Sequence, residues 1–133
     1  MFKPNLKELR EGLTMEIEAD NIQHLVAAAD IIHGKWEIEY ILVTLSENGV
    51  FISRQGSGAE SAHLILPAHV RQISDVSGAG DTVISVAGLC LAAGLNPREI
   101  ASLSNLAGGL VCEEIGVVPV NPARLLAEAK KLY

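Results

Sequence analysis

The sequence has few aromatic residues, two cysteines and a shortage of positive charge. Only 4% of its 133 residues are aromatic, and 10 Lys and Arg stand against 16 Asp and Glu, which gives a net charge of −6. Domains that bind DNA or RNA present a basic surface, so this charge balance excludes that class of protein. It also excludes a basic amphipathic face that would bind anionic membranes.

Long hydrophobic runs are absent as well. The longest, residues 83–93, is interrupted by Ser85 and is too short to cross a bilayer. Charged residues crowd the first eleven positions, where a signal peptide would need an apolar segment. Cys90 and Cys112 both fall in apolar helical stretches, so we expect two buried thiols and a cytoplasmic location.

Hydrophobic residues make up 49% of the chain, enough for a single domain over residues 1–133 with its own core. Apolar residues at helical spacing predict helices over 6–13, 22–34, 82–93, 96–111 and 122–132. The helix over 82–93 is apolar nearly all round, which is typical of a buried helix. Short runs of branched residues predict strands over 40–45, 50–53, 62–66 and 70–76. Together they indicate an α/β layered domain.

Some residues invite a functional interpretation that their spacing does not support. The four histidines, His24, His33, His63 and His69, show no metal-ligand spacing, and we expect them at the surface or at strand edges. The pair Gly108-Gly109 inside a helical pattern indicates close approach of another backbone or of a flat ligand, and close packing is the preferred interpretation.

The strongest motif is the segment 75–82, Asp-Val-Ser-Gly-Ala-Gly-Asp-Thr, between an expected strand and an expected helix. Glycines there allow a tight turn that presents backbone N–H groups at a helix N-terminus, a site for an anion such as phosphate. Asp81 repels an anion, and a general base aimed at an attacking hydroxyl would explain its presence. The alternative is a simple tight turn in which Asp81 favours the first helical turn.

Two other motifs each have both a structural and a functional interpretation. Asn5 and Glu8 have the spacing of a capping box, yet an Asn amide and a Glu carboxylate also suit a Mg²⁺ ion held mainly by phosphates. Residues 43–50 have the pattern of a strand, a turn at Gly49 and a returning strand. A Thr44 hydroxyl at the end of that strand also lies where ligands bind in open α/β sheets.

The three motifs occur in the order found in the ribokinase-like (PfkB) family of carbohydrate kinases, which the sequence resembles. The family's D-[TS]-x-G-A-G-D signature corresponds to residues 75–81, its N-x-x-E element to residues 5–8, and its T-x-G-x-x-G element to residues 44–49. Ser46 stands where Gly is usual, and Val76 where Thr or Ser is common. Within the family, T-x-S-E-x-G and GAGDTVIS are most similar to the heptose-phosphate kinase domain of ADP-heptose synthesis proteins.

For the chemistry, the resemblance implies that Asp81 is the base that deprotonates a sugar hydroxyl. The backbone of Gly78, Ala79, Gly80 and Asp81 would hold the transferring phosphoryl group as an anion hole. Asp75 would help to bind a monovalent cation such as K⁺, a role against which the Val76 departure counts.

For the nucleotide, the resemblance implies that Asn5 and Glu8 serve Mg²⁺, directly or through water, and the phosphates of ATP. The further residues that would line the ATP site are Thr44, Ser46, Gly49 and Asn105. The implied fold is a ribokinase-like, Rossmann-like layered partial domain: a mostly parallel sheet with a β-hairpin, followed by C-terminal helices.

A whole member of that family is more than twice as long, so the resemblance is to its nucleotide-binding C-terminal half. The function implied is ATP-dependent phosphorylation of a sugar or sugar phosphate, with heptose 7-phosphate the favoured substrate. The alternative is a nucleotide-binding or interaction module without its own catalysis. Because a half domain would leave a sheet edge uncovered, we expect a homodimer or other self-association through that edge.

Overall fold

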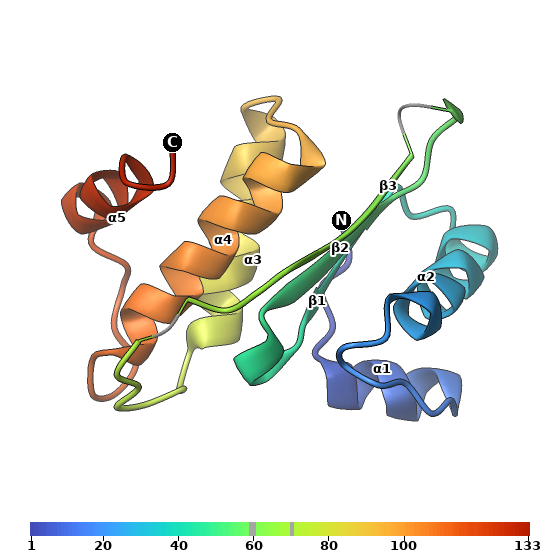
Figure 1. Cartoon of the computed structure of the whole chain (residues 1–133), viewed down its shortest axis with the longest axis horizontal. Coiled ribbons are helices and arrows are strands. Elements are labelled where there is room, and N and C mark those ends of the chain that lie inside the picture. The colour runs from blue at the N-terminus through green and yellow to red at the C-terminus, as the bar shows by residue number, and fades with distance from the viewer. Residues whose placement is uncertain (59–60, 70) are drawn as a thin grey trace. The chain divides into compact units, whose positions relative to one another are not determined.

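The structure, a computed structural model, describes residues 1–58, 61–69 and 71–133. The chain divides into two compact units, Met1–Pro67 and Ala68–Tyr133, and each is described by itself. Figure 1 shows the elements of both. That the whole chain forms a single domain stays a prediction.

The first unit begins with two helices whose starts are fixed by asparagine caps. Helix α1 spans Leu6–Leu13 and helix α2 spans Ile22–Trp36. The Asn5 side chain accepts a hydrogen bond from the Glu8 backbone, and the Asn21 side chain caps α2 in the same way. These caps satisfy N–H groups that have no partner inside the helix, so the predicted helices are confirmed.

The sheet of this unit has the order β1-β2-β3, with β1 at Tyr40–Thr44, β2 at Val50–Arg54 and β3 at Ala62–Leu66. A short 3₁₀ turn, η1 at Ser46–Asn48, joins the first two strands. Both pairings are antiparallel, so the expectation of a mostly parallel sheet is wrong for the described strands. Chain connections of this length form hairpins, whereas a parallel pair needs a long crossover.

Among the described residues, parallel pairing is limited to the residues before α1. Phe2 pairs with Ile41 and Asn5 with Thr44 in two isolated parallel bridges. The Phe2 amide donates to the Tyr40 carbonyl at 2.9 Å, and the Leu42 amide donates to the Phe2 carbonyl at 2.9 Å. The start of the chain therefore lies along β1, while β3 is the outer strand on the other side. Self-association through a sheet edge stays a prediction.

Helices α1 and α2 pack on one face of the sheet (Figure 1). Alternate residues of the strands point to that face, as the period of two in a strand requires. Ile41, Val43 and Phe51 are at most 1% exposed and pack with Leu25 and Ile32 of α2. This core fixes the direction of β1 and hence the place where its last residue, the predicted site residue Thr44, emerges.

The second unit consists of three helices. Helix α3 spans Ala79–Ala92, α4 spans Pro97–Cys112 and α5 spans Pro122–Ala129. Asn96 and Asn121 cap α4 and α5, each with a proline in the first turn, as their sequences predict. Helix α3 packs along α4, but it is not buried all round as expected, because its Leu89 is 72% exposed.

The expected strand over 70–76 is also wrong for residues 71–76. Residues 71–76 have no regular structure, and Val70 lies outside the described residues. The amides of Ser74 and Asp75 both donate to the Cys112 carbonyl, at 2.8 and 3.1 Å. These N–H groups bind the end of a helix rather than a neighbouring strand, so no ladder forms along this segment.

The cysteines and the absence of long apolar helices agree with the sequence. Cys90 and Cys112 are free and buried, as predicted. Burial raises the pKa of both thiols, which keeps them protonated at neutral pH. Within the described part of the chain, no helix is both long and apolar enough to span a membrane.

His33 contradicts the expectation of a surface position, because it is only 4% exposed. Its Nδ1 faces the Ile38 carbonyl, which can only accept, so Nδ1 donates and Nε2 accepts. The Ser53 hydroxyl then donates to His33 Nε2 at 2.7 Å and accepts from His63 Nδ1 at 3.1 Å. This chain of hydrogen bonds ties α2 to β2 and β3 and satisfies the buried polar atoms on this face of the sheet.

Substitution Ser53→Ala should destabilise the chain by about 1–3 kcal/mol, because it leaves His33 Nε2 buried without a partner. Chemical denaturation of the variant and the wild type measures this difference. The control Ser57→Ala changes an exposed loop serine and should shift the free energy of unfolding by less than about 0.5 kcal/mol. Equal stability of the two variants would show that the His33–Ser53 contact contributes nothing.

Candidate functional site

The glycine-rich segment forms a turn that no other residue type fits well. Gly78 is the N-cap of α3 and has a φ of 75°, in the left-handed region. A Cβ at this position would lie 2.9 Å from Cγ1 of Val117. Both the backbone conformation and the close neighbour therefore require a residue without a side chain.

The start of α3 differs from the other helix starts. Four of the five helices in the described residues have an asparagine side chain as cap, and α3 has no side-chain cap. The Ala79 amide reaches the Val76 carbonyl at 3.3 Å, while the amides of Gly80 and Asp81 have no partner within the helix. The positive end of the helix dipole is thus available to an anion.

Asp81 lies in the first turn of α3 and is exposed. Its backbone carbonyl accepts the Ser85 hydroxyl at 2.7 Å, a contact that does not involve the carboxylate. An exposed carboxylate beside unpaired helix amides is placed to take a proton from a group bound there. The predicted residues Gly78, Ala79, Gly80 and Asp81 thus lie together in one turn.

Asp75 is held by the backbone around it. Its Oδ1 accepts the Ser77 amide at 2.9 Å, and its Oδ2 accepts the Gly116 amide at 3.0 Å. Hydrogen bonds from the Ser77 hydroxyl and amide, and then from Gly116, lower the pKa of Asp75 below its ordinary value. The carboxylate is therefore ionised, and it joins the turn before α3 to the loop after α4.

The loop after α4 was not identified from the sequence. Gly116 and Val117 contact Asp75 and Gly78, more than 35 residues earlier in the chain. Gly116 has a φ of 81°, and an isolated glycine just past a helical pattern is the one local signal that indicates a turn there. Nothing in the sequence indicates which segment this turn contacts.

In the first unit, Asn5 and Glu8 form the capping box that their spacing predicts. The backbone N–H of Asn5 donates to Glu8 Oε2 at 2.8 Å, and the backbone N–H of Glu8 donates to Asn5 Oδ1 at 2.8 Å. Both residues are exposed, and the box uses one of the two Glu8 carboxylate oxygens. The other oxygen suits Mg²⁺ or one of its waters, because Mg²⁺ takes oxygen ligands and keeps several waters.

A metal site formed mainly by protein side chains needs several ligands close together. Among the described residues, no group of three or more His, Cys, Asp or Glu side chains is placed to hold a metal ion. Asn5 and Glu8 therefore fit Mg²⁺ as outer contacts of an ion whose other ligands are phosphates and water.

Thr44 lies beside Asn5, because the two are partners in a parallel bridge and the Thr44 amide donates to the Pro4 carbonyl at 3.2 Å. The turn that follows has Ser46 at a φ of 53° and Gly49 at a φ of 91°. A left-handed φ favours glycine, and Ser46 adopts it although it has a side chain. The first unit thus brings together Asn5, Glu8 and Thr44, with the turn directly after them.

Asn105 lies on α4 of the second unit and is half-buried. One turn later, Gly108 and Gly109 confirm the close-packing interpretation. A Cβ on Gly108 would lie 2.7 Å from Val83 Cγ2 of α3, and a Cβ on Gly109 would lie 3.3 Å from Arg71 Cδ. Protein side chains, not a flat ligand, occupy the space that the two glycines leave.

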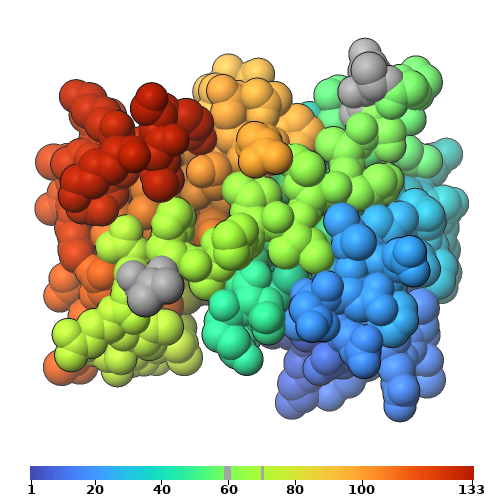
Figure 2. Space-filling view, in the orientation of Figure 1, coloured from blue at the N-terminus to red at the C-terminus, as the bar shows by residue number. Residues whose placement is uncertain are grey.

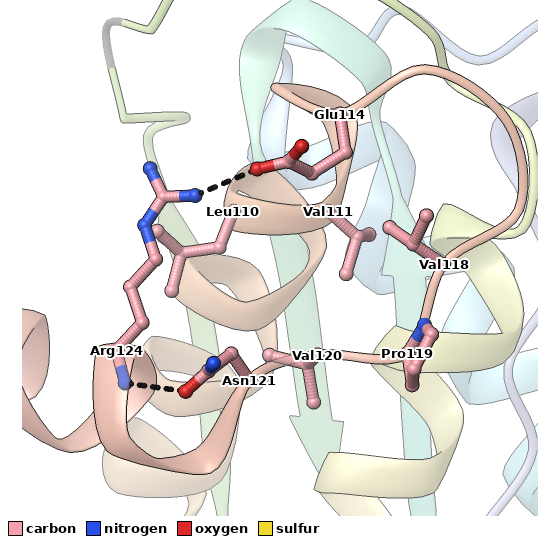
Figure 3. A pocket seen from close by; sticks show the side chains of 8 residues that line it. All are labelled: Leu110, Val111, Glu114, Val118, Pro119, Val120, Asn121 and Arg124. Atoms are coloured by element: carbon pink, nitrogen blue, oxygen red, sulfur yellow. Dashed lines mark hydrogen bonds and ion pairs between the residues drawn. The ribbon is translucent and has the colours of Figure 1, made fainter.

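Two pockets lie outside the glycine-rich turn. A groove of 560 Å³ on the first unit is lined by Glu8 together with Lys3, Leu9, Ile32 and Trp36, among others. A pocket of 280 Å³ on the second unit lies between the end of α4 and the start of α5 (Figure 3). Its walls are mostly apolar and include none of the predicted site residues, so we assign it no part in the chemistry.

Comparison with known proteins decides the family. The family of pfkB carbohydrate kinases matches residues 1–124. The chain belongs to this family. It is 37% identical over 133 residues to Bifunctional protein HldE of Aeromonas salmonicida, and 40% identical over 126 residues to Bifunctional protein HldE of Methylobacillus flagellatus. It covers 26% and 24% of those proteins, so it spans about a quarter of the length of the curated relatives that it matches.

Solved structures confirm the ribokinase-like fold. Phosphofructokinase-2 from Escherichia coli in complex with potassium aligns with a TM-score of 0.83 at 19% identity, over 98% of this chain and 40% of that one. Arabidopsis thaliana ribokinase complexed with ribose and ATP aligns with a TM-score of 0.79 at 21% identity, over 94% of this chain and 39% of that one.

Substitution Gly78→Ala should destabilise the second unit by at least about 1 kcal/mol, because alanine is strained in the left-handed region and would meet Val117. Thermal unfolding measures the effect. The matched control is Gly88→Ala on the exposed side of the same helix, where a Cβ meets nothing within 4 Å. It should stabilise the helix by about 0.5–1 kcal/mol, and equal effects of the two variants would contradict the account of Gly78.

Proposed function

We propose that this chain provides the ATP site and the catalytic base for phosphorylation of a sugar phosphate, with heptose 7-phosphate as the substrate. The observation that carries the proposal is the start of α3, where a family signature coincides with a helix N-terminus that has no side-chain cap. The choice of heptose rests on the T-x-S-E-x-G and GAGDTVIS segments and on the similarity to Bifunctional protein HldE.

In the proposed reaction, a sugar hydroxyl oxygen forms a bond to the γ-phosphorus of ATP, and the bond from that phosphorus to the β–γ bridging oxygen breaks. The Asp81 carboxylate accepts the hydroxyl proton, and ADP leaves. The Gly80 and Asp81 amides at the start of α3 donate hydrogen bonds to the transferring group, and the helix already orients these N–H groups before the reaction. Catalysis of this kind is mostly positioning and charge stabilisation.

The first unit supplies contacts to the nucleotide in this proposal. Asn5 and Glu8 bind waters of Mg²⁺, and the Thr44 hydroxyl with the turn of Ser46 and Gly49 binds ATP. Asn105 of the second unit lies near the base. When bound, Mg²⁺ neutralises phosphate charge, which matters for a chain whose net charge is −6.

The proposal includes a monovalent cation beside Asp75. Its support is the structure of a family fold solved with potassium. In this chain Asp75 is the residue proposed to face such an ion. Each of its carboxylate oxygens already accepts a backbone amide, so the ion would use the lone pairs that Ser77 and Gly116 leave.

The second candidate function is a nucleotide-binding module without catalysis of its own. The observation in its favour is that the chain covers only about a quarter of its curated relatives and 40% of a solved kinase of the same fold. Both candidates predict nucleotide binding, and they differ in turnover.

Isothermal titration of the chain with Mg·ADP should give saturable binding at one site. Substitution Gly80→Val should weaken binding by about tenfold or more, because a branched side chain beside the first-turn amides obstructs an anion there. The matched control Gly88→Val makes the same change on the exposed side of α3 and should leave binding unchanged. No binding by the folded wild-type chain would refute the assignment of the ATP site.

Substitution Asp81→Asn should leave Mg·ADP affinity intact and lower phosphoryl transfer by about 10²–10⁴-fold, the usual contribution of a general base. The assay follows ADP release from Mg·ATP with heptose 7-phosphate. Full turnover by Asp81→Asn would exclude Asp81 as the base. A wild-type chain that binds Mg·ADP yet releases no ADP in the presence of sugar would favour the second candidate.

A further inference from the structure

Arg71 is a half-buried cation that the proposed reaction does not use. Its side chain is 13% exposed and lies across Gly109 of α4. Nη1 donates to Glu113 Oε1 at 2.9 Å, and Nη2 donates to Glu128 Oε2 at 3.4 Å. One guanidinium thus joins the segment before α3 to the end of α4 and to α5.

Glu113 is the centre of this cluster. Besides Arg71 it binds Arg124 of α5, which also reaches Glu114 at 3.3 Å. The hydrogen bond from Arg71 lowers the pKa of Glu113, and the one from Arg124 acts in the same direction. The carboxylate is therefore ionised and remains bound to both guanidinium groups at neutral pH.

Cys112, the residue before Glu113, binds the middle of the same segment. The Cys112 carbonyl accepts the amides of Ser74 and Asp75, and the Asp75 carboxylate in turn binds the amides of Ser77 and Gly116. Segment 71–78 is therefore attached at Arg71 and at its middle, Ser74 and Asp75, to the end of α4 and the loop that follows. Figure 2 shows yellow-green atoms of this segment at the surface of the second unit.

Stability alone is a poor explanation for such a cluster. Taking two charged groups out of water costs free energy that their attraction often only offsets. In addition, Arg71 Nε is buried and has no hydrogen-bond partner in the described part of the chain. What the cluster does provide is a fixed geometry, because a guanidinium binds two carboxylates in a defined arrangement that a lysine cannot reproduce.

We propose that Arg71 is a positioning residue for the glycine-rich turn. It holds segment 71–78 against the end of α4, so that the amides at the start of α3 are in place before an anion binds. Pre-organised donors bind more tightly because no ordering remains to be done on binding. The identity of the anion as a nucleotide phosphate rests on the proposed function, whereas the ordering of the turn does not.

Amide hydrogen exchange followed by NMR tests the ordering directly. Substitution Arg71→Met keeps the aliphatic stem over Gly109 and removes both ion pairs. It should speed exchange of the Ser77 and Gly116 amides by about tenfold or more, while Leu106 in the core of the unit stays as in the wild type. Arg71→Lys keeps the charge and reaches one carboxylate, so it should restore part of the protection.

The matched control is Arg124→Met, which removes a guanidinium from the same Glu113 but from α5 rather than from segment 71–78. It should leave Ser77 and Gly116 exchange within about twofold of the wild type. In a titration with Mg·ADP, Arg71→Met should weaken affinity by about tenfold, and Arg124→Met should not.

Unchanged exchange of Ser77 and Gly116 in Arg71→Met overturns the proposal. So does equal acceleration of Leu106, which would make Arg71 a residue of general stability. If Arg71→Met does not fold, Arg71→Lys is used instead. Faster exchange of the Ser77 amide with unchanged exchange of the Leu106 amide then supports the positioning role. A wild-type chain that does not bind Mg·ADP refutes the proposed function, and the exchange measurements still decide the role of Arg71.

Discussion

The second unit depends on the absence of a side chain at position 108. Val83 of α3 lies within 2.7 Å of the place where a Cβ of Gly108 would be, and the Ala79 carbonyl lies 3.9 Å from it. Helices α3 and α4 can therefore approach closely near the N-terminus of α3. Four residues later α4 ends at Cys112, whose carbonyl binds the segment that leads into the glycine-rich turn. A side chain at 108 would separate the helices and displace the turn from the residues that hold it.

The same turn has to hold acidic residues beside a proposed anion site. The negative charge of Asp75 would repel an anion bound nearby. Backbone amides of Ser77 and Gly116 donate hydrogen bonds to its carboxylate and partly compensate that charge. Because its pKa in the folded state is below the unfolded value, these bonds contribute stability above the unfolded pKa of about 3.9, and that contribution is lost as the pH falls through the folded value. At neutral pH Asp75 is ionised and its hydrogen bonds are intact.

Local signals in the sequence are sufficient to predict the helices and the β1–β2 hairpin. Caps such as Asn5 and Asn96 act within four residues, so their effect can be read from spacing alone. The family signature likewise placed Gly78 to Asp81 in one turn. The failures concern partners distant in the chain. A run of apolar residues cannot reveal that the Ser74 amide binds the Cys112 carbonyl, or that His33 of α2 binds Ser53 of β2.

Arg71 shows the same limit for the candidate site. It stands in a segment that the sequence favours as a strand, and its partners Glu113 and Glu128 are 42 and 57 residues away. No spacing rule connects residues so far apart, since the connection exists only after α4 and α5 have packed. Residues that hold a site in place are therefore harder to find from one sequence than residues that form it.

Asn5 and Glu8 show that a structural and a functional interpretation of one motif need not compete. The capping box uses one carboxylate oxygen of Glu8, an exposed residue in the first turn of α1. A free glutamate would have to lose side-chain entropy on binding an ion or its waters, whereas this one is already ordered by the cap. If Glu8 serves Mg²⁺ or its waters as proposed, the bond that begins α1 also orders the side chain for that role, and removal of either partner would affect both roles together.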